Sequence, residues 1–206
     1  MNKIVTWDIF AKQEQLTLSQ LKQFKKYTAM LVEANEKFNI TAILDESKII
    51  SHHFVDSLRL GDFYEINKNT VLCDVGTGGG FPGLPLKIKY PDIHLFLIEV
   101  NKKKASFLQS VIDELGLENC TVITSDWRTF IRETKHPINI FCARASLQPE
   151  QLLKMFKPAC HYAGQTLVYW AAEYWKPMLR EKSFIVQDHE YSIENKKRRL
   201  IFFKKP

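Results

Sequence analysis

Two stretches in the first third of the chain repeat apolar residues at helical spacing. Residues 17–38 place them every three or four positions, after a Thr17–Gln20 pair with the spacing of a capping box. Residues 45–60 repeat the pattern and end at Gly61, a residue type that commonly terminates helices. The sequence therefore predicts two amphipathic helices near the N-terminus. Their inward positions are Leu21, Phe24, Thr28, Leu31 and Ala34 in the first, and Ile50, Phe54 and Leu58 in the second.

From residue 70 onward the pattern changes to short, continuous apolar runs separated by helix-like stretches. Continuous rather than alternating apolar residues are typical of strands buried on both faces, as in a parallel sheet. Between the second and third runs, Asn101 can cap a helix over residues 102–115 that stops at Gly116. Because strands and helices alternate, we expect parallel strands joined by right-handed crossovers. The predicted strands are residues 71–75, 94–100, 121–124, 138–145 and 165–170.

Two further strand-like runs, residues 183–187 and 199–203, are separated by a polar link at residues 188–197. They can form a hairpin at the edge of the sheet, where lysines disfavour pairing with another chain. The predicted fold class is therefore α/β, with a Rossmann-like, mostly parallel seven-stranded sheet and an N-terminal helical extension. We expect residues 1–66 to form a helical cap and residues 67–206 the core, packed as one compact unit.

A glycine-rich loop follows the first predicted strand, in the run Val71-Leu-Cys-Asp-Val-Gly-Thr-Gly-Gly-Gly-Phe-Pro-Gly83. Asp74 ends the strand, and the glycines lack side chains, so backbone N–H groups can approach a ligand closely. The next strand ends at Glu99, which follows Gly76 by 23 residues. That separation is close to the ~20 residues at which a carboxylate meets ribose hydroxyls. The loop predicts a site for a nucleotide-like ligand without a 2′-phosphate, which the carboxylate would repel. A plain turn that binds nothing is the alternative.

The order of the glycines narrows the ligand further. The loop reads G-x-G-G-G rather than G-x-G-x-x-G, and Pro82 and Pro85 leave the first turn of the following helix with few N–H donors. The loop is therefore less suited to a pyrophosphate. An Asp-x-Gly-x-Gly strand end, with an acid at the end of the next strand, is typical of S-adenosylmethionine-dependent methyltransferases with a Rossmann-like sheet.

Composition and charge exclude several classes of protein. The 206 residues are 45% hydrophobic and 25% charged, which is enough for one sizeable core or two small ones. This excludes a disordered, collagen-like or miniature disulfide-rich chain. The net charge is +6, and the last 31 residues contain nine basic and four acidic side chains. The local excess predicts contact with a polyanion such as nucleic acid, with a solvated tail as the alternative.

The four cysteines indicate neither a disulfide framework nor a metal site. They include no close pair, no Cys-x-x-Cys and no Cys/His cluster with metal-ligand spacing. Residues 1–10 include Asp8 and lack the apolar stretch of a secretory signal, and no window approaches membrane-spanning length. We therefore expect a cytoplasmic protein that requires no metal and has no membrane partner.

Several motifs together resemble one family. Across roughly residues 35–203 the chain resembles the bacterial 16S rRNA guanine-N7 methyltransferases, the glucose-inhibited division protein B family. The resemblance implies a class I S-adenosylmethionine-dependent enzyme that methylates N7 of a guanine in the decoding-region loop of small-subunit rRNA. It implies S-adenosylmethionine as cofactor and 16S rRNA or the assembling small subunit as partner, and we expect a monomer. The motifs are Asn39-Ile-Thr41, His53-Phe-Val-Asp-Ser-Leu58, Asp74 to Gly83, Glu99 with Lys103 and Phe107-Leu108, Ala143-Arg-Ala145, and Arg199-Leu200.

The resemblance also implies cofactor-binding positions, among them Glu99 at the ribose. The family usually has a glutamate where Arg128 stands, and a Lys-Gly pair where this chain reads Tyr169-Trp-Ala-Ala172. The Asp126 carboxylate can instead accept the adenine amino proton, while Trp127 covers the face of the adenine. The predicted cofactor-binding residues are Asp74, Gly76, Gly78, Gly80, Phe81, Glu99, Asp126, Trp127, Arg128 and Arg144.

Candidate substrate-binding residues lie on the second helix, at the end of the fourth strand and in the basic C-terminal segment. His53 and Asp56 are three residues apart on a helix, so the carboxylate can orient the imidazole, with capping and packing as the alternative. Arg144 can contact cofactor, phosphate or a base edge, or form a structural ion pair. The predicted substrate-binding residues are His53, Asp56, Arg144, Arg198 and Arg199. The aromatic residues Tyr169, Trp170, Tyr174 and Trp175 are expected in the core, with base stacking as the alternative. Lys102–Lys104 are expected at an exposed helix start, with phosphate contact as the alternative.

Methylation of guanine N7 requires no general base, because that nitrogen has a free lone pair and no proton to lose. The protein's task is alignment and a polar surrounding for the new cation, so no catalytic residue is assigned. The departures at Arg128 and residues 169–172 leave two alternatives open. One is an S-adenosylmethionine-dependent methyltransferase with another acceptor, and the other is a non-catalytic RNA-binding relative.

Overall fold

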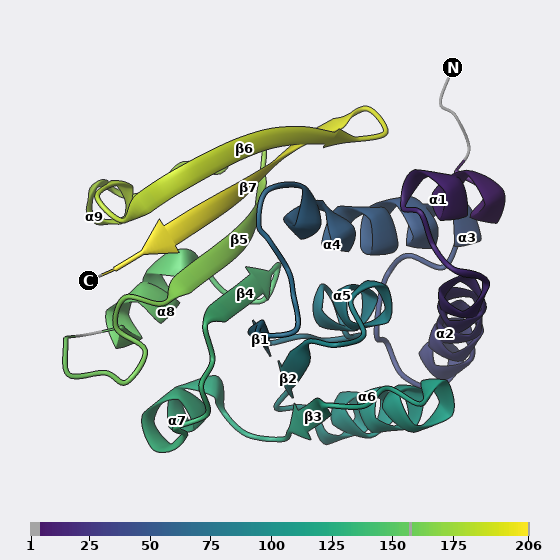
Figure 1. The fold of residues 1–206 in the computed structure, drawn as a ribbon, viewed down its shortest axis with the longest axis horizontal. Helices are drawn as coiled ribbons and strands as arrows, with labels where there is room; N and C mark the ends of the chain where they lie inside the picture. The colour runs from purple at the N-terminus through teal and green to yellow at the C-terminus, as the bar shows by residue number, and fades with distance from the viewer. Residues whose placement is uncertain (1–4, 157, 206) are drawn as a thin grey trace.

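A mixed sheet of seven strands forms the centre of the computed structural model, which describes residues 5–156 and 158–205 (Figure 1). The strand order is β3-β2-β1-β4-β5-β7-β6. The first five strands pair in parallel, and β7 lies antiparallel between β5 and β6. The predicted α/β class with a mostly parallel seven-stranded sheet is confirmed. The strands are β1 Val71–Val75, β2 His94–Ile98, β3 Cys120–Ile123, β4 Ile140–Arg144, β5 Thr166–Ala172, β6 Ile185–Ile193 and β7 Lys196–Lys204.

The C-terminal hairpin is longer than predicted. The expected polar link at residues 188–197 is wrong, because most of it is strand and only Glu194 and Asn195 separate β6 from β7. The reason is the place of β6 at the edge of the sheet, where one face of a strand meets solvent. Along β6 the side chains at 189, 191 and 193 are at least partly buried and their neighbours are exposed, so polar residues alternate with buried ones.

The N-terminal region forms the two predicted helices. Helix α2, Leu18–Lys37, begins at a Thr17 cap, and its capping box is present: Gln20 N donates to Thr17 Oγ1 at 3.2 Å and Thr17 N donates to Gln20 Oε1 at 2.9 Å. The second helix is one run of mixed type over residues 46–62, here called the 46–62 helix. It comprises α3 Glu46–Lys48, the π-helical η1 Ile49–Val55, α4 Asp56–Leu58 and the 3₁₀ turn η2 Arg59–Asp62.

Helices cover both faces of the sheet because successive strand residues point to opposite sides. Leu72 of β1 belongs to a core shared with α1 Trp7–Gln13, α2, the 46–62 helix, α5 Gly83–Lys89 and α6 Lys102–Leu115. Cys73 and Val75 belong to the opposite core, with α7 Trp127–Glu133 and α8 Pro149–Met155 (Figure 1). Helix α9, Leu179–Lys182, precedes β6. Among the described residues, no helix has both the length and the apolar character needed to cross a membrane.

The N-terminal helices pack onto the sheet through aromatic residues. Phe54 lies with its ring centroid 4.9 Å from that of Phe24, and Tyr27 stacks at 5.6 Å on Phe81 of the glycine-rich loop. All four side chains belong to one buried cluster that reaches the central strands. The 46–62 helix is therefore held against the carboxyl ends of the strands, where the glycine-rich loop begins. The division into units 1–66 and 67–206 stays a prediction.

Candidate functional site

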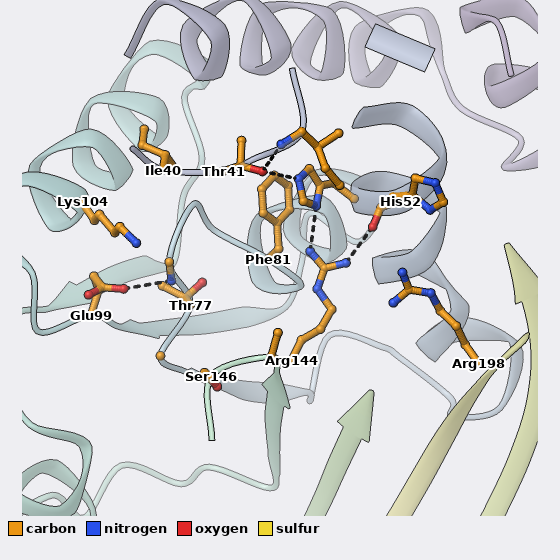
Figure 2. Close-up of a pocket in the computed structure, with 15 residues that line it drawn as sticks. Ile40, Thr41, His52, Thr77, Phe81, Glu99, Lys104, Arg144, Ser146 and Arg198 are labelled. Carbon is orange, nitrogen blue, oxygen red and sulfur yellow. Dashed lines mark hydrogen bonds between the residues drawn. The ribbon is translucent and has the colours of Figure 1, made fainter. Parts of the chain in front are cut away.

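A cavity of about 510 Å³ opens at the carboxyl ends of β1, β2 and β4 (Figure 2). The chain runs from β1 outward to β2 on one side and returns to β4 on the other, so the cavity lies at the point where the strand order reverses. In open α/β sheets this is where ligands bind. Seven predicted site residues line it: His53, Gly76, Gly78, Phe81, Glu99, Arg144 and Arg198.

The glycine-rich loop forms one wall of the cavity. Gly76 and Gly78 have φ angles of +68° and +60°, a region that favours glycine. A Cβ on Gly76 would lie 2.7 Å from Ser146 Cβ, whereas a Cβ on Gly78 would meet nothing within 4 Å. Gly78 N donates to Glu99 Oε2 at 2.9 Å, and Asn101 N donates to Glu99 Oε1 at 2.8 Å. The loop and the Glu99 carboxylate are thus held together beside open space.

Asp74 and Gly80 support this loop from beneath and are not among the cavity-lining residues. The buried Asp74 Oδ2 accepts from Thr77 Oγ1 at 2.6 Å and from Gly83 N at 2.8 Å. Burial raises the pKa of Asp74 to about 6, and the two hydrogen bonds act in the opposite direction. A Cβ on Gly80 would lie 2.4 Å from Leu84 Cδ1, so this glycine permits close packing.

His53 is held in one tautomer by its neighbours. Arg144 Nη2 lies 3.2 Å from His53 Nδ1, and an arginine can only donate, so Nδ1 accepts. The proton is therefore on Nε2, which lies 2.9 Å from Thr41 Oγ1. The imidazole stacks on Phe81 with ring centroids 4.2 Å apart. Burial, followed by the nearby Arg144 charge, lowers the pKa of His53 to about 3, so the ring is neutral at pH 7.

Asp56 joins two arginines behind the cavity wall. Its side chain is 0% exposed, and Oδ2 accepts from Arg144 Nη1 at 2.8 Å and from Arg198 Nη1 at 3.2 Å. Tyr191 Oη donates to Oδ1 at 2.8 Å, and Trp170 Nε1 donates to the Asp56 carbonyl at 2.9 Å. The predicted orientation of His53 by Asp56 is indirect, because Arg144 lies between them. Asp56 does not line the cavity.

The two adjacent arginines of β7 point in different directions. Arg198 lines the cavity, and its buried Nε has no partner among the described residues. Arg199 instead pairs with Asp188 on β6 and donates from Nη1 to the Trp175 carbonyl at 2.8 Å. Successive residues of a strand face opposite sides, so only one of the two can reach the cavity.

Asp126, Trp127 and Arg128 lie beyond Glu99, at the start of α7. Glu99 N donates to the carbonyl of Ile123, three residues before Asp126, at 3.1 Å. The Asp126 carboxylate caps α7 by accepting from Arg128 N at 2.9 Å, and the Arg128 guanidinium lies 4.4 Å from the Trp127 ring centroid. None of the three is among the cavity-lining residues. Their assignment to the adenine stays a prediction.

Eight further residues line the cavity without having been predicted as site residues. Ser146 Oγ donates to the Val75 carbonyl at 2.7 Å, and Lys104 comes from the first turn of α6. His52 Nε2 lies 3.5 Å from Glu194 Oε2, and its buried Nδ1 has no partner among the described residues. The signals were weak: Thr41 lay in a motif whose side chains could equally face solvent, and Lys104 was expected at an exposed helix start. That expectation is wrong for Lys104, which is partly buried and lines the cavity. The eight are Ile40, Thr41, Ile43, His52, Thr77, Lys104, Ala145 and Ser146.

The cavity has two chemically different ends (Figure 2). The glycine-loop end contains Glu99 and Lys104, with Gly78 hydrogen-bonded to Glu99. The cationic end contains His52, Arg144 and Arg198. Of the lining side chains, three are cationic and one is a carboxylate.

Solved structures show which fold class this arrangement belongs to. A structure titled MtNAS in complex with MTA and tNA matches with a TM-score of 0.63 and 14% identity, covering 97% of this chain and 76% of that chain. A SAM-dependent methyltransferase from Aquifex aeolicus matches with a TM-score of 0.55 and 14% identity, covering 85% of this chain and 98% of that chain. The fold is that of the class I S-adenosylmethionine-dependent methyltransferases.

Sequence comparison is more specific. The family model described as rRNA small subunit methyltransferase G matches residues 20–204. A curated relative, the ribosomal RNA small subunit methyltransferase G of Listeria monocytogenes, is 36% identical over 161 residues, which are 77% of this chain and 68% of the relative. The chain belongs to the rRNA small subunit methyltransferase G family.

Proposed function

We propose that this protein transfers a methyl group from S-adenosylmethionine to N7 of a guanine in the decoding-region loop of small-subunit rRNA. The observation that carries the proposal is the cavity. In a chain of this family, the cavity has a glycine-rich loop suited to a nucleoside at one end and cationic side chains at the other. We further propose that the protein acts in the cytoplasm as a monomer, on 16S rRNA or the assembling small subunit.

The glycine-loop end fits S-adenosylmethionine. Gly78 faces open space where any side chain would project, so a ligand can approach the backbone there. Glu99 is fixed by two backbone N–H groups, and each of its oxygens retains acceptor capacity for a ribose hydroxyl. When bound, the cofactor supplies an electrophilic methyl group on a positively charged sulfur. Asp74 would act through the loop, by holding Thr77 and Gly83 in place.

The cationic end fits a nucleotide of RNA. Arg144 and Arg198 share the single Asp56 carboxylate, so one carboxylate serves two guanidinium charges. Guanidinium groups recognise phosphates and base edges through several N–H donors at once. A phosphate of the target nucleotide can therefore be held at this end, while the base reaches the glycine-loop end.

The side chains present position reactants and move no proton. Guanine N7 carries a lone pair and no proton, so the reaction needs alignment rather than a general base. His53 is neutral and its Nδ1 lone pair accepts from Arg144, so it serves to orient that guanidinium. Arg144, in turn, is held by Asp56 and by the His52 carbonyl, to which Nη1 donates at 3.0 Å.

The test compares 16S rRNA from cells with and without this gene. N7-methylguanosine is detected as a site where the strand breaks after chemical reduction, and one site in the decoding-region loop should disappear on deletion. The intact gene should restore it and a Gly78→Asp gene should not. An unchanged cleavage pattern would contradict the rRNA target, and calorimetry with S-adenosylmethionine would then separate another acceptor from a protein that binds no cofactor.

A further inference from the structure

A second hollow of about 390 Å³ adjoins the cavity on the side of the cationic end. One wall comes from the segment after β5 and contains Glu173 and Tyr174. The other wall is the β6–β7 turn and the start of β7, with Lys196 and Lys197. Arg198 lines both spaces, so the hollow, here called the side groove, lies next to the cavity.

Tyr174 differs from the aromatic residues around it. Tyr169 and Trp170 are buried, and Trp175 packs against Tyr169 with ring centroids 5.3 Å apart. Tyr174 is 85% exposed, and its ring packs on no other ring of the described residues. The expectation of a core position therefore holds for its three neighbours and is wrong for Tyr174. A ring in this position is free to stack on a ligand.

The opposite wall of the side groove is basic and fixed in place. Glu194 in the β6–β7 turn accepts from Ser51 Oγ at 2.8 Å and lies 3.5 Å from His52 Nε2, so the turn is tied to the 46–62 helix. Lys196 and Lys197 follow directly, are exposed, and form no ion pair with a described residue. The lining of the groove thus combines an exposed aromatic ring with two ammonium groups that form no ion pair with a described residue.

We propose that the side groove binds the single-stranded RNA next to the target nucleotide, with Tyr174 stacking on a base and Lys196 and Lys197 contacting phosphates. The proposal rests on the proposed function, because it extends the RNA path outward from the methyl-transfer cavity. In a double helix of RNA, the guanine N7 edge faces a deep, narrow groove that proteins cannot enter, so the target must be unpaired or turned out. Its neighbours are then available to stack.

The combination of side chains favours RNA over a protein partner. Every base has a face that can stack on an aromatic ring, and cations beside that ring track the backbone. A protein-binding groove would instead centre on buried apolar contacts. Tyr174 is the exposed large hydrophobic residue among those that line the groove, and three of its neighbours there are cationic.

The first experiment measures RNA binding and single-turnover methylation with 16S rRNA, and in parallel with small subunits, from cells lacking the gene. Tyr174→Ala should weaken RNA affinity roughly tenfold, since a base stacked on an aromatic ring contributes about that factor or more. Tyr174→Phe keeps the ring and should retain wild-type affinity. Leu179→Ala is the matched control, because Leu179 is also 85% exposed and lies outside the groove.

A second experiment tests the two lysines through the salt dependence of RNA binding. Lys196→Ala and Lys197→Ala should each reduce the slope of log affinity against log salt by about 0.7, the value for one phosphate contact on a single strand. Lys68→Ala is the control, because Lys68 is exposed before β1, at the opposite ends of the strands from the cavity. Affinity for S-adenosylmethionine should be unchanged in all three variants.

The outcomes separate this inference from the proposed function. If the wild type methylates the rRNA and Tyr174→Ala binds it as tightly as Leu179→Ala does, the side groove is not an RNA path while the function stands. If Tyr174→Phe is as weak as Tyr174→Ala, the stacking of Tyr174 on a base is refuted, because the hydroxyl and not the ring then accounts for the loss of affinity. If the wild-type protein neither binds nor methylates either of the two substrates, both proposals fail.

Discussion

Arg144 at the end of β4 donates to the buried carboxylate of Asp56, 88 residues earlier in the chain, at 2.8 Å. The contact fixes a guanidinium of the central sheet against the 46–62 helix. Arg198 of the C-terminal hairpin donates to the same carboxylate oxygen at 3.2 Å. Asp56 is therefore a positioning residue that brings together the three chain segments forming the cationic end.

The first prediction concerns this carboxylate. Asp56→Asn keeps the shape of the side chain and removes the charge that two guanidiniums share, so both lose their buried counter-ion. The free energy of unfolding should fall by about 3–5 kcal/mol, as for other broken buried ion pairs. Urea unfolding measures it, and Glu33→Gln, which breaks the exposed pair with Lys37, is the control and should leave stability unchanged. Equal stability of the two variants would contradict a structural role for Asp56.

The sequence predicts the glycine-loop end of the cavity better than it predicts the cationic end. Gly78 and Glu99 could be placed together because each follows a predicted parallel strand, and such strands end at one edge of the sheet. The Asp56–Arg198 contact spans 142 residues and depends on hairpin register, which local pattern does not specify. A shift of one residue would exchange Arg198 with Arg199. Which of the two arginines faces the cavity is set by how β7 packs between β5 and β6.

Other differences have local causes. Helix α1 was not predicted, because it has seven residues of which only Phe10 is buried, and so short a stretch shows no clear period. Tyr174 and Trp175 are both aromatic and adjacent in the sequence, yet Tyr174 is exposed and Trp175 packs against Tyr169. Whether an aromatic residue packs or projects after the end of a strand depends on the loop path, which the sequence pattern does not reveal.

The second prediction tests the glycine loop. Gly78→Asp should reduce affinity for S-adenosylmethionine by at least tenfold, because a carboxylate would project into the cavity beside Glu99. Calorimetry measures the affinity and thermal unfolding measures the strain at positive φ. Gly116→Asp is a matched control: Gly116 also has φ near +60° with open space at Cβ, at the end of α6 and outside the cavity lining. A similar loss of affinity in both variants would show that the effect is only backbone strain.

The third prediction separates the two possible roles of Asp126. Its carboxylate caps α7, and aspartate and asparagine are comparable caps, so Asp126→Asn should leave the thermal stability nearly unchanged. If the carboxylate also accepts the adenine amino proton, the same substitution should weaken S-adenosylmethionine binding about tenfold, the usual size of a hydrogen bond to a charged group. Unchanged affinity in Asp126→Asn would limit this residue to capping. Asp126→Ala, which removes both roles, should lose stability and affinity together.

The last prediction concerns pH. Burial lowers the pKa of His53 from 6.5 to about 3, so between these values the unfolded chain binds a proton that the folded chain does not. The stability that the neutral ring contributes is fully present above pH 6.5 and is lost as pH falls through this range. His53→Gln removes the titrating group, so its deficit in stability relative to the wild type should shrink by about 2 kcal/mol between pH 7.5 and 5. Urea unfolding at both pH values measures the deficit.

Because Asp74 titrates equally in both proteins, its opposite effect cancels in the difference. A deficit that stays constant from pH 7.5 to 5 would mean that His53 accepts a proton in the folded protein and that the hydrogen bond from Arg144 does not hold it neutral.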